Sequence, residues 1–465
     1  MKRTKTLAIL GIVLVAMCAA IAIVKGVEQH IDSINTIDEE IVTLDTTTIS
    51  EVSWEYGEAS LDFVKTDDVW VSTDDETFPV DQDYMYDFLD YFSSVHASFI
   101  IDDVEDYDQY GLETPEATLT FSFDDEESED LTISFGAFST MDSKRYISIG
   151  NGSVYLIDDD LLEYVSTDRD DFILNDVMES FDQVTKFDVA GDNNVTICFD
   201  DENNYTYTDS YNYYLVENGN YRALSGSYAK AYINLIKNMS FTDYATYNAS
   251  TSDLSEYGLD NPSLTCTIEG EVSEDDATVV KTVTVYVGVT GEDDERLAYA
   301  RMGDSEIIYN ISTDDYDSLL EGGYDNLRPS EVISANGDYI SSVNVTFEGT
   351  VYTINIDESE DDVKYYVNDY EVDISDVMSN IQALTLSEVT TDADAGDLEF
   401  TFTINQDFNG YDALTVSMYR YDGDSVVVTF NGETIGLMDR SYMVDLRESV
   451  TKMILNLGKE EAEEE

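Results

Sequence analysis

Positive charge is scarce in this chain: its 465 residues hold 22 Lys and Arg against 100 Asp and Glu, a net charge of −78. Such a surface repels nucleic acid and anionic lipid headgroups, because binding either one requires Lys and Arg to displace counterions. The composition therefore excludes nucleic acid as a partner. It favours solvated acidic faces, with weak, non-specific cation binding as the functional alternative.

Histidine is scarcer still, with two copies. A Ser-His-Asp or Cys-His site would need His30 or His96. His30 falls in a predicted stalk, and His96 is expected to be an exposed residue at the end of a helix, with no visible partner. Phosphate loops, Gly-rich dinucleotide fingerprints and Cys/His metal spacings do not occur in the sequence. We therefore predict no catalytic, cofactor-binding or metal-binding residues, and a protein that is not an enzyme.

An apolar run near the N-terminus, residues 7–24, carries no charge and just reaches the length of a membrane-spanning helix. Basic residues precede it, so the N-terminus is expected in the cytoplasm and the bulk of the chain outside the cell, anchored in the cell membrane by a single pass. Residues 1–27 are predicted to be a basic tip with a transmembrane signal anchor, and residues 28–42 a stalk. Cleavage as a signal peptide, or lipidation at Cys18, is the alternative.

A short motif occurs twice, 147 residues apart: Tyr-Gly-Leu, then Pro after two more residues. The spacing predicts a tandem array of one domain of roughly 145 residues. Each glycine suits a positive φ, and each proline precedes a predicted strand. We favour a structural turn between helix and sheet, with a ligand-binding loop as the alternative. The motif residues are Tyr110, Gly111, Leu112 and Pro115 in the first copy and Tyr257, Gly258, Leu259 and Pro262 in the second.

An amphipathic helix recurs with nearly the same period. Apolar residues follow the offsets 0, 3, 4, 7 and 10 within residues 85–95, 229–239 and 374–384, and these stripes start 144 and 145 residues apart. That pattern is typical of a helix packed on one side. The third copy has no Tyr-Gly-Leu, so we interpret it as a diverged repeat.

Around each helix, apolar and polar residues alternate with a period of two, which predicts strands. Pairs such as Asn431-Gly432 predict tight hairpins. Each repeat is therefore expected to be mostly antiparallel sheet with one amphipathic helix across a face, an α+β fold. The predicted domains are residues 43–175, 183–330 and 336–458, the last one diverged, and residues 459–465 form an acidic, disordered tail.

The tyrosine-rich stretch and the cysteines each allow two interpretations. Of 34 tyrosines, five lie within residues 205–214, where a strand is predicted at residues 204–208. Strand tyrosines usually serve the sheet, and an exposed binding surface is the alternative. Cys266 matches Leu119 of the first repeat, which predicts a small core residue. A Cys198–Cys266 disulfide is the alternative, although the inferred faces differ.

With these residues the chain resembles the bacterial domain-of-unknown-function 4340 family over about residues 43–330. Similar proteins are anchored by one N-terminal helix, and their genes often lie beside ABC transporter components. The resemblance implies an extracytoplasmic accessory role with no known activity. It rests on the amphipathic helix and on Val69-Trp70, Tyr110-Gly111-Leu112, Pro115, Gly136, Val154-Tyr155, Tyr257-Gly258-Leu259, Pro262 and Gly288.

Together these features lead to one functional hypothesis. We expect a non-enzymatic, membrane-anchored protein that acts as an accessory or scaffolding subunit of a membrane complex such as an ABC-type exporter. Its partners would be the membrane, through residues 7–24, and another protein of that complex. The alternative is a surface binding module for glycan, peptide or cations.

Overall fold

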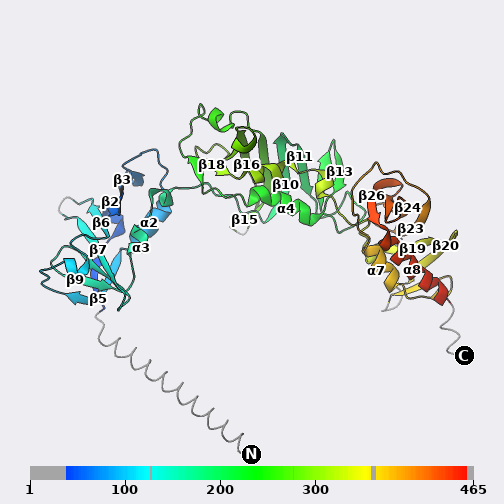
Figure 1. Cartoon of the computed structure of the whole chain (residues 1–465), viewed down its shortest axis with the longest axis horizontal. Coiled ribbons are helices and arrows are strands. Elements are labelled where there is room, and N and C mark those ends of the chain that lie inside the picture. Colours follow the sequence, from blue (N-terminus) through cyan, green and yellow to red (C-terminus); the bar gives the residue numbers. More distant parts are fainter. Residues whose placement is uncertain (1–37, 126–127, 276, 358–362, 458–465) are drawn as a thin grey trace, which may run out of the picture. The chain divides into compact units, whose positions relative to one another are not determined.

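The structure is a computed structural model that describes residues 38–125, 128–275, 277–357 and 363–457. By its internal contacts the chain divides into two compact units, with the boundary between Asn175 and Asp176. Three sheets, of nine, nine and eight strands, form the framework (Figure 1). The first sheet belongs to the first unit and the other two belong to the second. The fold is α+β, mostly antiparallel, with tandem domains, as predicted.

The first domain packs an aromatic core between its sheet and its helices. The Trp54 ring lies 4.9 Å from Phe88 and 5.4 Å from Phe172, measured between centroids. Asp81 caps the first helix by accepting a hydrogen bond from the Tyr84 N–H at 3.1 Å. The elements are β1 Glu39–Thr43, β2 Ile49–Tyr56, β3 Ala59–Thr66, β4 Val69–Ser72, α2 Gln82–Asp90, β5 Ser94–Ile101, β6 Ala117–Phe123, β7 Leu131–Ser139, β8 Lys144–Ser148, β9 Val154–Ile157 and α3 Leu162–Val165.

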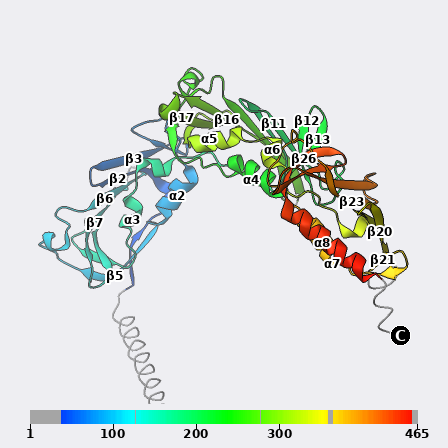
Figure 2. The same cartoon turned by 45° about the vertical axis from the view of Figure 1, so that its right-hand side comes forward.

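The second domain places three helices together on its sheet. The first of them, α4, contacts both α5 and α6 (Figure 2). Tyr232 of α4 donates its hydroxyl to the Leu319 carbonyl at 2.7 Å, which ties α4 to α5. The elements are β10 Gln183–Gly191, β11 Val195–Phe199, β12 Tyr213–Glu217, β13 Asn220–Ala223, α4 Gly226–Lys237, β14 Tyr244–Thr246, β15 Leu264–Glu274, β16 Ala277–Thr290, β17 Leu297–Met302, β18 Ile308–Ile311, α5 Thr313–Leu320 and α6 Tyr324–Leu327.

The third domain covers its core with two helices that lie side by side, α7 and α8 (Figure 2). Asp439 starts α8 by accepting a hydrogen bond from the Ser441 N–H at 2.8 Å. The buried side of α8 presents Met443, Leu446, Val450 and Met453 to the core. The elements are β19 Ile340–Phe347, β20 Thr350–Asp357, β21 Lys364–Val367, β22 Tyr370–Glu371, α7 Ser375–Gln382, β23 Leu398–Gln406, β24 Ala413–Arg420, β25 Ser425–Phe430, β26 Glu433–Asp439 and α8 Arg440–Asn456.

The three sheets share one strand order. The first reads β5-β9-β8-β7-β6-β2-β3-β4, with β1 added outside β5, and the second reads β14-β18-β17-β16-β15-β10-β11-β12 before β13. The third reads β26-β25-β24-β23-β19-β20-β21-β22. The third sheet has no strand at the position of β5 and β14 in the described residues. An isolated β-bridge between Glu388 and Leu437 of β26 takes that position. The tandem repeat is therefore visible in the topology, and the third domain belongs to it.

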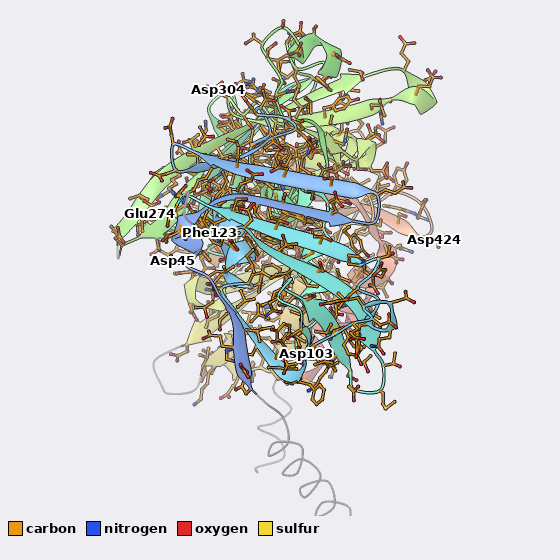
Figure 3. The ribbon with its side chains drawn as sticks, turned by 90° about the vertical axis from the view of Figure 1, so that its left-hand side faces the viewer. Asp45, Asp103, Phe123, Glu274, Asp304 and Asp424 are labelled. Carbon is orange, nitrogen blue, oxygen red and sulfur yellow. The ribbon has the colours of Figure 1, made fainter. Side chains whose placement is uncertain are left out.

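Each sheet buries one face, and in the described residues no α-helix covers the opposite face of the first sheet (Figure 3). That opposite face carries hydroxyl pairs at matching positions in all three domains. Cross-strand hydroxyls of this kind stabilise paired strands. The pairs, with oxygen–oxygen distances of 3.1, 3.3 and 2.9 Å, are Thr120–Thr132, Thr267–Thr284 and Thr403–Thr415.

The N-terminal predictions fall largely outside the described residues. The apolar run at 7–24 is one of these, and no helix within the described part of the chain has the length and apolar character needed to cross a membrane. The described chain starts inside the predicted stalk: Glu39–Thr43 is β1, which pairs with β5 at the edge of the first sheet. The first folded domain thus includes residues that we expected to precede it.

Several element predictions need correction. The helix stripe expected at residues 85–95 contains a helix that ends at Asp90, and its last position, Val95, lies on β5. Residues 204–208 form no strand and belong to a loop. Each domain has more than the one helix expected. In the third domain the additional helix, α8, is the longest element in the described residues, because it shields a side of the core that α7 leaves open.

Candidate functional site

The Tyr-Gly-Leu motif forms the same turn in both copies. A short 3-10 helix, Asp108–Tyr110 in the first domain and Leu254–Tyr257 in the second, ends at a glycine with a left-handed backbone. The φ angles are 67° at Gly111 and 68° at Gly258, so the positive φ predicted for both glycines is confirmed. A glycine in this conformation commonly closes the end of a helix, because a side chain there is strained.

A second glycine lets each turn lie directly on the sheet. A Cβ atom on Gly136 of β7 would lie 2.3 Å from the Tyr110 carbonyl oxygen. A Cβ atom on Gly288 of β16 would lie 2.2 Å from the Tyr257 carbonyl oxygen. Both distances are far inside van der Waals contact, so the turn and the strand can approach this closely only without a side chain at that position.

The side chains of the motif pack against the same sheet. The Tyr110 ring lies 5.1 Å from Tyr146 of β8, and the Tyr257 ring lies 5.1 Å from Tyr299 of β17. The leucine after each glycine is buried, and each proline stands two residues before a strand, β6 or β15. These contacts support the structural interpretation over a ligand-binding loop, because the motif packs against its own sheet.

The tyrosine-rich stretch is a loop that docks on the third domain. Residues 200–212 join β11 to β12, whereas the matching connection in the first domain is residues 67–68 alone. From this loop the Tyr207 ring reaches to 5.0 Å from Phe430, and its hydroxyl accepts a hydrogen bond from the Ser334 N–H at 3.3 Å. Burial raises the pKa of Tyr207 to about 12. We call residues 200–212 the latch.

Amide side chains of the third domain hold the latch backbone. Gln406 Nε2 donates to the Tyr207 carbonyl at 2.7 Å, and Asn409 Nδ2 donates to the Asn203 carbonyl at 2.7 Å. Gln406 is buried, and a buried amide group that loses its partner destabilises the fold. The latch therefore does not form a strand. It fixes the second domain to the third.

A cavity of about 560 Å³ opens in the first domain between β5, the end of β9 and the segment that follows it. Its floor is apolar and buried, and its rim is polar. The residue after α2, Tyr91, also lines it, and its ring stacks on Tyr164 with centroids 3.7 Å apart. The floor consists of Val95, Ala97, Ile157 and Leu161, and the polar lining includes Asp38, Ser94, His96, Ser98, Asp158 and Asp159.

His96 lies at this cavity, on β5, and has two partners, so the prediction of a partnerless helix-end residue is wrong. Its Nδ1 is 2.7 Å from Asp38 Oδ1, and its Nε2 is 3.2 Å from Ser94 Oγ. Asp38, His96 and Ser94 thus follow one another in the same order as the acid, base and nucleophile of a catalytic triad. Ser94 Oγ, however, donates to Glu40 Oε1 at 2.7 Å, which lowers the pKa of the Glu40 carboxyl.

Because a carboxylate accepts the Ser94 proton, the hydroxyl is not directed at the imidazole. The Asp38 side chain is 84% exposed, so the pair also lacks the buried setting that activates a nucleophile. The three side chains orient one another at the rim of the cavity.

Two segments of the chain match the family described as Domain of unknown function (DUF4340), residues 70–246 and residues 214–401. Together the two matches cover well over half of the chain. The chain belongs to this family. No curated protein and no solved structure matches it.

The two DUF4340 matches follow the period of the fold. They start at residues 70 and 214, which are 144 apart, the same interval as between the first two helix stripes. The first match starts in β4 and the second in β12, which hold the same place in their sheets. The second match ends in β23, so it enters the third domain although that domain lacks the Tyr-Gly-Leu turn.

Within the described part of this DUF4340 protein, the remaining side chains form no metal site and no disulfide. In the described residues, His, Cys, Asp and Glu side chains form no group of three or more that would hold a metal ion. Cys198 and Cys266 are both free thiols. Cys266 pairs with Val189 on the core face, Cys198 pairs with Lys186 on the other face, and burial raises the pKa of the Cys266 thiol to about 12.

Proposed function

We propose that the protein is a non-enzymatic, membrane-anchored extracytoplasmic subunit with an accessory or scaffolding role in a membrane complex, such as an ABC-type exporter. The observation that carries this proposal is the latch. A scaffold must hold its docking faces in a fixed relation, and the latch gives two neighbouring domains one buried aromatic contact with several hydrogen bonds.

Other features support the same role. The motif that recurs in tandem packs onto its own sheet, so the repeats are built as structural modules. The acidic surface keeps a long extracytoplasmic chain soluble and discourages contact with anionic headgroups. The predicted anchor at residues 7–24 would keep the array close to a membrane-embedded partner.

The experiment is a pull-down of the full-length tagged chain from membranes of its own host in a gentle detergent, followed by mass spectrometry. We expect enrichment of a membrane-spanning permease and a nucleotide-binding subunit over a control pull-down with an unrelated single-pass protein. Recovery of the chain from the membranes without any membrane-spanning partner would contradict the proposal.

A variant of the latch tests the scaffolding part separately. Tyr207→Ala should weaken recovery of the partners, because the two domains lose their fixed relation. Tyr228→Ala is the matched control, since Tyr228 is 47% exposed on α4 and lies outside the latch. Equal recovery with both variants would support an accessory subunit that binds through a single domain, and would contradict a scaffold that binds through two.

A further inference from the structure

We propose that Asn409 is a site of spontaneous deamidation, and that its conversion to an acid loosens the latch between the second and third domains. This inference goes beyond the accessory role, because it assigns a modification site and a consequence for the coupling of two domains. Three observations lead to it: the residue that follows Asn409, the hydrogen bonds that its side chain makes, and the charge of the latch.

Asn409 and Gly410 form an exposed turn between β23 and β24. Both have a left-handed backbone, with φ angles of 50° and 77°, and the Tyr411 N–H donates to the Phe408 carbonyl at 2.8 Å across them. Because Gly410 has no side chain, its backbone nitrogen is not shielded from the side-chain carbonyl carbon of Asn409. An asparagine before a glycine therefore meets the least steric resistance to deamidation.

The reaction needs water and no other partner. The Gly410 nitrogen bonds to the side-chain carbonyl carbon of Asn409, the bond from that carbon to Nδ2 breaks, and Nδ2 leaves as ammonia with the proton of the Gly410 nitrogen. Water then opens the resulting succinimide ring at either carbonyl, which leaves an aspartate or an isoaspartate. Both products lack the amide N–H groups of the side chain and carry a negative charge at neutral pH.

Those N–H groups are the ones that hold the latch. Asn409 Nδ2 donates to the Asn203 carbonyl at 2.7 Å and to the Thr206 carbonyl at 3.3 Å. A carboxylate only accepts hydrogen bonds, so after conversion it would face two carbonyl oxygens with no proton between them. The same two bonds slow the reaction in the docked state, because the side chain must leave them before its carbonyl carbon can turn towards the Gly410 nitrogen.

The charge of the latch strengthens the effect of conversion. A further negative charge at position 409 is repelled by the segment that it has to hold. A second amide repeats the arrangement, since Asn336, which precedes Gly337, donates to Asp209 Oδ2 at 2.7 Å. Residues 200–212 contain no basic residue and four acidic ones: Asp200, Asp201, Glu202 and Asp209.

Asn431 and Gly432 provide a matched turn in the same domain. Their φ angles are 50° and 88°, and both residues are exposed. The Asn431 side chain uses its oxygen instead of its nitrogen: Oδ1 accepts a hydrogen bond from the Thr415 N–H at 2.8 Å. An aspartate keeps that acceptor, so deamidation at Asn431 leaves this contact in place and does not involve the latch.

The first test measures what conversion does to the latch. Hydrogen–deuterium exchange of the full-length chain in detergent, read by peptide mass spectrometry, reports how often residues 200–212 open. We expect their backbone amides to exchange about five-fold faster or more in Asn409→Asp, because the loss of one ordinary hydrogen bond changes an opening equilibrium by about that factor. In Asn431→Asp they should exchange at the native rate. Exchange in β23 and β24 checks that the fold is kept, and equal latch exchange in Asn409→Asp and the native chain overturns the proposal.

The second test measures whether the latch controls the reaction. The full-length chain is kept at mildly alkaline pH, and peptide mass spectrometry follows the loss of the amide at Asn409 and Asn431. The double variant Tyr207→Ala/Gln406→Ala removes the ring contact with Phe430 and the hydrogen bond to the Tyr207 carbonyl. In it we expect Asn409 to deamidate about five-fold faster or more than in the native chain, and Asn431 at an unchanged rate.

Equal rates at Asn409 in the two chains overturn the proposal, and so does an Asn409 that stays unconverted in the double variant while Asn431 reacts. The first test does not use this variant, so a double variant that fails to fold leaves the proposal open to contradiction. Neither test depends on a partner, so the outcome is separate from that of the pull-down.

Discussion

Gly111 and Gly258 are single residues on which a whole turn depends, for two separate reasons. Each has a positive φ, and each lies so close to the neighbouring strand that a side chain would collide with it. For Gly111 the nearest atom to a Cβ would be the Ala137 backbone nitrogen at 2.8 Å, and for Gly258 the Val289 carbonyl oxygen at 2.8 Å. Backbone atoms cannot rotate away, so the strand itself would have to move.

Gly57 separates these two reasons experimentally. It has a φ of 62°, and a Cβ there would meet nothing within 4 Å. We expect Gly57→Ala to lower the unfolding free energy by about 1 kcal/mol through backbone strain alone, and Gly111→Ala by about 2 kcal/mol or more. Chemical denaturation with a probe of the first domain measures both. Equal losses of unfolding free energy in the two variants would show that β7 moves away from a side chain at residue 111 without a loss of stability.

Among the helices and strands, the sequence predicts those with regular patterns best. Three helices and the strand that follows each motif lie near their expected places. The helix predicted at residues 85–95 extends beyond α2 because Val95 is buried in the same core but lies on β5. A buried apolar residue gives the same signal in the sequence whether it belongs to a helix or to a strand. The stripe of α8, at Met443, Leu446, Val450 and Met453, has helical spacing and was available in the sequence.

Some properties of the candidate site residues could be predicted from the local sequence, and others depend on residues far away in the chain. The positive φ of the motif glycines follows from local turn chemistry, so it could be predicted. The role of Tyr207 could not, because its partner Gln406 is 199 positions away and no local pattern encodes that contact. The only local signal was the length of the loop at residues 200–212 compared with the first domain. The Asp38 partner of His96 likewise depends on the pairing of β1 with β5, whereas Ser94 lies two residues before His96 on the same strand.

The helix α8 gives a prediction about the stability of the third domain. Leu446 is 1% exposed in the core, whereas Val444 on the same helix is 38% exposed. Leu446→Ala should lower the unfolding free energy by about 2–4 kcal/mol, because it leaves a cavity among packed side chains. Val444→Ala should change it by less than about 0.5 kcal/mol. If the two substitutions had equal effects in chemical denaturation, α8 would not be part of the core.

For the second unit as a whole, the latch predicts a dependence on high pH. Burial raises the pKa of Tyr207 to about 12, whereas an exposed tyrosine ionises near pH 10. The docked state therefore keeps a proton that the released state loses. The docking free energy is fully present below about pH 10 and falls as the pH rises towards 12, by roughly 2 kcal/mol.

Tyr207→Phe isolates this contribution from the other tyrosines, because it keeps the ring and removes the ionisable hydroxyl. We expect the melting temperature of the second unit to fall less steeply between about pH 10 and pH 12 in the variant than in the native chain. The variant should be slightly less stable near neutral pH, since the Ser334 N–H loses its acceptor. Parallel curves would mean that the pKa of Tyr207 is the same in the docked and released states, which would contradict the prediction.

The latch also predicts how the second and third domains unfold relative to each other. Tyr207 packs on Phe430, and Gln406 and Asn409 donate to the backbone beside it, so unfolding either domain removes contacts from the other. In calorimetry the native chain should show one shared transition for these two domains, besides that of the first domain. Tyr207→Ala should split the shared transition in two, because the domains then lose the buried ring contact with Phe430 and the hydrogen bond from the Ser334 N–H. Tyr228→Ala should leave it whole. A single transition that persists in Tyr207→Ala would show that the hydrogen bonds from Gln406 and Asn409 to the latch backbone couple the domains without the Tyr207 ring.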